Sequence, residues 1–132
     1  MSNIVELIKN IPDVDYIKGC TDEQIEEAEK ELGLKFPQEY IDYVKAFGCV
    51  DFFGHEFTGL NIEGRLNTVN ATKKEQSVND AFPAGFFVLE NLGIDAKVII
   101  VDEQGGVYVL QNNSINKMST CISEYIRICK VM

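Results

Sequence analysis

The sequence predicts an α+β fold, a single domain over residues 1–132 in which a mostly antiparallel sheet is flanked by N-terminal helices and a C-terminal helix. Apolar residues recur at helical spacing near both ends of the chain, whereas short β-branched and aromatic runs occupy much of the middle. The length is close to that of one domain. With 45% hydrophobic and 25% charged residues, the composition is that of a globular protein with its own core.

The first two helices are predicted from local start and stop signals. Residues 4–11 repeat apolar positions at helical spacing until Pro12, which cannot continue the hydrogen-bond ladder. A second helix begins at a capping box made by Thr21 and Gln24, and Gly33 provides its C-terminal stop. Its inward stripe is Ile25, Ala28 and Leu32.

A third helix and a change to β structure follow. Pro37 is predicted at the first helical position, and Gly48 ends the helix. Its inward positions are Tyr40, Ile41, Val44 and Phe47. The segments VDFFGHEF and TGLNI, broken by Gly54 and Gly59, predict a strand pair with a turn. The polar stretch LNTVNATKKEQSVND then contains good helix formers and predicts a fourth helix.

From Phe86 onward the sequence is rich in β-branched residues. FFVLENL, AKVIIVD and GGVYVLQ predict three strands, the last two joined as a hairpin. In the tail, STCISEYIRICKVM predicts a closing helix capped by Ser119 or Thr120. Its inward face is Ile122, Tyr125, Ile126 and Cys129.

The net charge of −9 is unevenly distributed. Residues 1–56 carry 13 acidic and 5 basic side chains, a net charge of −8, whereas residues 57–132 carry 8 and 7, a net charge of −1. An acidic field repels phosphate backbones and anionic lipids and attracts basic proteins. We therefore expect no direct binding to nucleic acid or membrane. Surplus acid also serves solubility, so the charge alone does not establish a function.

The cysteines and the N-terminus indicate a cytoplasmic protein. Cys20, Cys49, Cys121 and Cys129 form no C-x-x-C pair and lie within or beside apolar stretches, as buried reduced thiols do. The start of the chain lacks a basic leader followed by an apolar run, and no later segment has the length of a membrane span.

The sequence predicts no catalytic residue, cofactor or metal site. The chain has one histidine, His55, and its neighbour Glu56 would face the other side of a strand. The cysteines lack ligand-like spacing. Gly105 and Gly106 lack the following helix and lysine of a phosphate-binding loop. An enzyme relying on His55 and scattered carboxylates is the weakest of the alternatives.

Two blocks of sequence resemble a known family. In EAEKELGLKFPQEYIDYVKAFG, a glutamate-rich helix is followed by Leu32-Gly33, Pro37, Tyr40 and a terminal Gly48. The second block is NTVNATKKEQSVNDAFPAGFFVLENLG followed by VIIVDEQGGVYVL, with a hairpin turn at residues 102–106. Together they resemble the SUKH superfamily, which includes yeast cell-wall-assembly regulators and bacterial immunity proteins.

The resemblance implies stoichiometric binding without catalysis. We expect an immunity protein that neutralises a cognate toxin, a basic nuclease domain, by occlusion; the alternative is a regulatory adaptor or scaffold. The acidic residues provide the candidate partner surface, although an acidic helix face is also explained by solvation alone. The candidate partner-binding residues are Asp22, Glu23, Glu26, Glu27, Asp51, Glu56, Asp102 and Glu103.

Overall fold

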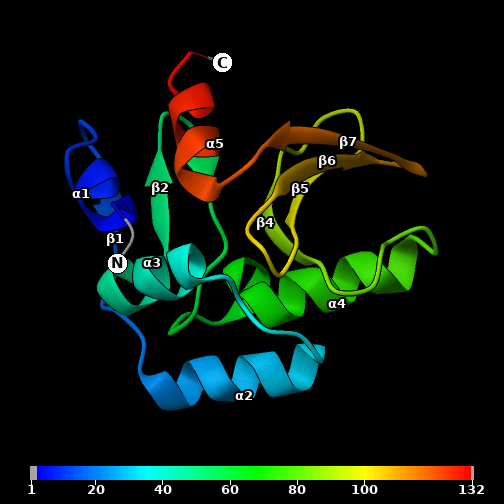
Figure 1. Ribbon diagram of the computed structural model, residues 1–132, viewed down its shortest axis with the longest axis horizontal. Helices are drawn as coiled ribbons and strands as arrows, with labels where there is room; N and C mark the ends of the chain where they lie inside the picture. Colours follow the sequence, from blue (N-terminus) through cyan, green and yellow to red (C-terminus); the bar gives the residue numbers. More distant parts are fainter. Residues whose placement is uncertain (1–2, 132) are drawn as a thin grey trace.

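The computed structural model describes residues 3–131 and confirms the α+β class, with helices packed on antiparallel sheets. Figure 1 shows α2 at one end of the molecule, the larger sheet at one side and α5 beside the smaller sheet. The elements are α1 (Ile4–Lys9), β1 (Asp15–Tyr16), α2 (Asp22–Leu32), α3 (Gln38–Phe47), β2 (Val50–Phe52), β3 (His55–Glu56), η1 (Gly64–Leu66), α4 (Thr68–Val78), β4 (Phe87–Asn91), β5 (Lys97–Val101), β6 (Val107–Gln111), β7 (Ser114–Ser119) and α5 (Ile122–Cys129).

The predicted boundaries of α2 are confirmed, whereas α3 begins one residue later than predicted. Thr21 and Gln24 form the reciprocal capping box, and Gly33 ends α2 with a φ of 66°. Pro37 is the N-cap of α3 and not its first helical residue, because its ψ of 154° is extended. Gly48 ends α3 as predicted, with a φ of 71°.

The smaller sheet differs from the predicted strand pair. β2 and β3 form a hairpin wholly within VDFFGHEF, turning through Phe53 and Gly54 at positive φ. The TGLNI segment contributes only an isolated bridge between Gly59 and Asn67, so its prediction as a strand is wrong. The two-residue strand β1, which pairs with β2, is too short to leave a periodic signal in the sequence.

The larger sheet has the order β4-β5-β6-β7, with every neighbouring pair antiparallel. The predicted strands and the hairpin between β5 and β6 are confirmed. The fourth strand, β7, is absent from the prediction because its segment SINKMS is mostly polar and exposed. Ser119 belongs to this strand.

The N-terminus of α5 is capped from another helix. Its N-cap residue is Cys121, which makes no side-chain cap hydrogen bond, so the predicted capping by Ser119 or Thr120 is wrong. Instead the Glu39 carboxylate, on α3, accepts hydrogen bonds from the backbone N–H groups of Ile122 at 2.7 Å and Ser123 at 3.3 Å. This contact fixes the closing helix against α3.

Both faces of β4 and β5 in the larger sheet are covered. Phe87, Leu89 and Ile99 face the main core with α1, α2, α3 and α5, whereas Val88 and Ile100 face α4 and the segment after it. β4 and β5 are therefore buried almost continuously. Within residues 3–131, none of the helices combines the length and apolar character needed to cross a bilayer.

Candidate functional site

The predicted acidic face of α2 is exposed in the structure. Asp22, Glu23, Glu26 and Glu27 all face solvent, because the inward stripe of the same helix is buried in the main core. Asp22 lies 2.9 Å from the ammonium group of Lys45, so part of its charge is already neutralised. The remaining three glutamates leave a strongly negative helix face.

A groove of about 790 Å³ lies between α2, the loop before α4 and the start of α4. Glu27, Glu31 and Glu63 supply the ionisable groups, and no lysine or arginine of the described chain is among the lining residues. Glu31 forms an ion pair at 3.4 Å with Lys73. Other lining residues are Leu60, Ile62 and Val69, which add apolar surface.

The loop that forms one wall of this groove is held in place by side-chain hydrogen bonds. The Asn61 side chain donates to the carbonyl of Lys18 at 3.0 Å and accepts from the Gln24 side chain at 3.4 Å. Asn67 donates to the carbonyl of Ile62 at 3.0 Å. These hydrogen bonds hold this wall of the groove in position.

Glu103 lies near the end of α2, whereas Asp102 stabilises the turn between β5 and β6. The Glu103 carboxylate accepts from the backbone N–H of Lys35 at 3.0 Å. It lines a depression at the C-terminal part of α2 together with Glu26 and two lysines, Lys30 and Lys35. Asp102 accepts hydrogen bonds from Gln104 and Gly106 within the β5-β6 turn.

Asp51 and Glu56 lie apart from α2. They are paired across β2 and β3, and α3 lies between this small sheet and α2 (Figure 1). Asp51 is exposed and also faces Asp15 of β1; slight desolvation and the nearby charges of Asp15 and Glu56 raise its pKa. Arg65 pairs with Glu56 at 3.0 Å. Asp51 and Glu56 therefore belong to an acidic surface separate from the exposed face of α2.

His55 has a buried partner that the sequence analysis does not predict. Its Nδ1 lies 2.8 Å and 3.1 Å from the two oxygens of Glu90, on β4. The His55 side chain is 12% exposed and that of Glu90 only 2%. Burial raises the pKa of Glu90, while the hydrogen bond and charge of His55 oppose that shift. An acidic residue inside the apolar run FVLEN is the one sequence signal for this site.

A β-bulge accompanies the placement of Glu90. The register of β4 against β5 passes from Val88–Ile100 to Glu90–Ile99, which leaves Leu89 as the extra residue. A bulge locally redirects the side chains that follow it. Leu89 faces the main core, and the Glu90 carboxylate reaches His55 beside that core.

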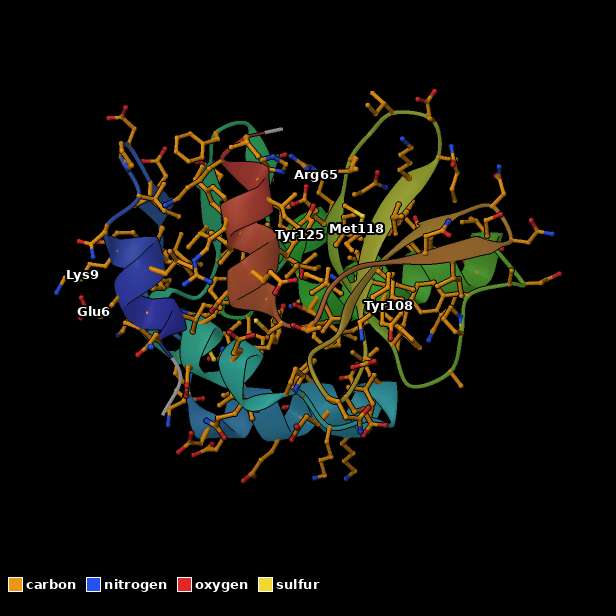
Figure 2. The ribbon with its side chains drawn as sticks, turned by 45° about the horizontal axis from the view of Figure 1, so that its top comes forward. Glu6, Lys9, Arg65, Tyr108, Met118 and Tyr125 are labelled. Carbon is orange, nitrogen blue, oxygen red and sulfur yellow. The ribbon has the colours of Figure 1, made fainter. Side chains whose placement is uncertain are left out.

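Beside this pair lie Tyr125 and Cys129 of α5. Figure 2 shows Tyr125 projecting from α5 toward the larger sheet. Burial and the nearby Glu90 carboxylate raise the pKa of Tyr125, and the same two causes raise the pKa of Cys129 to about 12. A cavity of about 710 Å³ has His55 and Glu90 in its wall.

Comparison with known proteins identifies the family. A family model described as SUKH_6, SMI1-KNR4 cell-wall, matches residues 22–126. The chain belongs to this SUKH family. Its matched segment runs from the first residue of α2 into α5 and includes all of the acidic groove, whereas α1, β1 and Cys129 lie outside it. A search of curated proteins found no match.

Proposed function

We propose that this SUKH protein is an immunity protein that binds a basic toxin domain, a nuclease, through the acidic face of α2 and the adjoining groove. The observation that carries the proposal is the groove itself, where Glu27, Glu31 and Glu63 surround apolar surface. SUKH families include toxin-immunity proteins, which supports a binding role over a catalytic one.

Binding there would act by occlusion. A nuclease presents lysine and arginine side chains where it holds the phosphate backbone. Exposed carboxylates on α2 attract that surface and accelerate encounter, and the apolar residues Leu60, Ile62 and Val69 provide area to exclude water. Occupation of the phosphate-binding surface then prevents substrate from entering.

A regulatory adaptor is the second candidate, favoured by the cell-wall description of the matched family. Such a protein docks other proteins without neutralising any activity. Growth of the cells that express the two proteins distinguishes the two functions. The gene adjacent to that of this chain is expressed alone and together with this chain; immunity predicts that the neighbouring product is toxic and that co-expression restores growth. A complex that forms without toxicity or rescue favours the adaptor.

The acidic-face version of the proposal is tested by charge reversal at Glu23, Glu26 and Glu27. Lysine at all three positions is expected to slow association with the toxin by tenfold or more, because electrostatic steering changes on-rates by about 10–10³-fold. The same variant should show a weaker dependence of the association rate on salt. Stopped-flow measurements at several ionic strengths provide both quantities.

A charge-matched control places lysine at Glu6, Asp80 and Asp95, which are exposed and lie on α1 and in loops away from α2. This control has the same net charge as the α2 variant. Equal slowing in both variants would attribute the effect to net charge and reject the α2 surface. Lysine at Asp51 tests the separate acidic surface on the small sheet.

A further inference from the structure

Three potential metal ligands meet where β3, β4 and α5 pack together. An imidazole nitrogen of His55, a carboxylate oxygen of Glu90 and the sulfur of Cys129 all lie within 4.8 Å of one another. The residues are separated by 35 and 39 positions in the sequence, so no spacing motif announces them. Only the fold brings them together.

A fourth polar group, the hydroxyl of Tyr125, lies beside the same cluster. The Tyr125 hydroxyl is fully buried and makes no hydrogen bond of acceptable geometry within the described chain. Its neighbours are Glu90 and Cys129. A buried hydroxyl without a well-formed hydrogen bond destabilises the folded state, so native proteins rarely leave one unsatisfied.

The His55–Glu90 interaction alone does not explain this arrangement. A buried histidine–carboxylate pair is complete once its hydrogen bond is made. It requires neither a thiol nor an unsatisfied hydroxyl at the same point. The convergence of nitrogen, oxygen and sulfur donors from three elements is instead typical of a cation site.

We propose that His55, Glu90 and Cys129 bind a zinc ion. Imidazole, carboxylate and thiolate are all zinc ligands, whereas magnesium and calcium prefer oxygen donors alone. A neutral imidazole, one carboxylate and one thiolate balance the charge of Zn²⁺, and the thiol proton leaves to solvent. The remaining position is within reach of the Tyr125 hydroxyl or of water from the cavity beside His55 and Glu90.

The ion would join three parts of the chain, of which β3 and β4 are already linked by the His55–Glu90 hydrogen bond. It would tie the β2-β3 hairpin to β4 of the larger sheet and both to the last turn of α5. Ions that bind only the folded state stabilise it by mass action. The zinc site therefore fixes the closing helix, independently of which partner the acidic groove binds.

Cobalt titration tests the ligand set directly. The full-length chain is prepared without a histidine tag, because His55 is its only histidine, and is treated with a chelator under reducing conditions. Co²⁺ is then added without oxygen. We expect one equivalent to produce the thiolate-to-cobalt charge-transfer band and the visible bands of tetrahedral coordination, and Zn²⁺ to abolish both by displacement.

Two cysteine variants on and beside α5 assign the thiol. Cys129→Ser is expected to lose the charge-transfer band, whereas Cys121→Ser, which changes a thiol outside the cluster, retains it. Circular dichroism verifies that both variants are folded. The proposal is overturned if the unsubstituted protein gives no charge-transfer band, or if folded Cys129→Ser retains it.

A second test of the zinc site needs no cysteine substitution. Saturating Zn²⁺ is expected to raise the Tm of the unsubstituted protein and to protect Cys129 from alkylation, as followed by peptide mass spectrometry. His55→Gln should lose the Tm shift. An equal shift in His55→Gln, or unchanged alkylation of Cys129 with Zn²⁺ present, would assign the zinc effect to other groups and reject the site.

Discussion

At the scale of single residues, the core depends on tyrosines whose hydroxyl groups join separate segments. The Tyr43 hydroxyl donates to the carbonyl of Thr58 at 2.7 Å and accepts from the backbone N–H of Val50 at 3.2 Å. Tyr40 contacts the hydroxyl groups of Thr58 and Thr68 from the same helix. These contacts satisfy buried backbone groups where α3 meets β2 and the segment after β3.

Removing one hydroxyl tests this role. Tyr43→Phe keeps the ring but leaves the Val50 N–H and the Thr58 carbonyl without that partner, so the free energy of unfolding should fall by about 1–3 kcal/mol. Urea denaturation measures the loss. Tyr16→Phe is the control, since Tyr16 is 58% exposed, and should change stability by less than about 0.5 kcal/mol. Similar losses in both variants would contradict the account.

At the scale of elements, α5 depends on a side chain 83 positions away in the sequence. Glu39 accepts from two of the first backbone N–H groups of α5, which no local cap satisfies. It also contacts the Ser123 hydroxyl. A carboxylate at this end also complements the helix dipole, so one residue of α3 both starts α5 and sets its position.

Glu39→Ala should destabilise the protein by about 0.5–2 kcal/mol, the range found for lost N-caps. Glu26→Ala, an exposed glutamate on α2, is the matched control and should have little effect. Hydrogen exchange provides the sharper measurement, because protection should fall first in residues 122–129. Uniform loss of protection across α2 and α5 would show that Glu39 acts on global stability alone.

Elements that start and end at local signals are predicted from the sequence, whereas long-range contacts are not. The capping box of Thr21 and Gln24 and the stop at Gly33 are local signals, and the structure confirms them. The cap from Glu39 and the pairing of His55 with Glu90 are long-range contacts that depend on the packed fold. Asp51 and Glu56 lie apart from the acidic face of α2 for the same reason. Sequence spacing does not specify how helices and hairpins are arranged.

At the scale of the whole molecule, tyrosine hydroxyl and cysteine thiol groups that are buried in their protonated form limit stability at high pH. Burial raises the pKa of Tyr40 and of Tyr43 above the ordinary value of tyrosine. It also raises the pKa of Cys20 and of Cys49, each to about 11. In the unfolded chain these groups return to ordinary values of about 8.5 for cysteine and 10 for tyrosine.

The consequence is a loss of stability in alkali. Below both pKa values the groups are protonated in either state and the stability is fully present. As pH rises past 10, the unfolded tyrosines ionise while Tyr40 and Tyr43 remain protonated in the fold. The unfolded state then binds fewer protons, so the free energy of unfolding falls by about 1.4 kcal/mol per pH unit for each group.

Urea denaturation at a series of pH values measures this slope, and Tyr43→Phe should reduce it by the contribution of one group. An unchanged slope in that variant, or tyrosinate absorbance from all five tyrosines before the circular dichroism signal is lost, would contradict the burial of these hydroxyl groups.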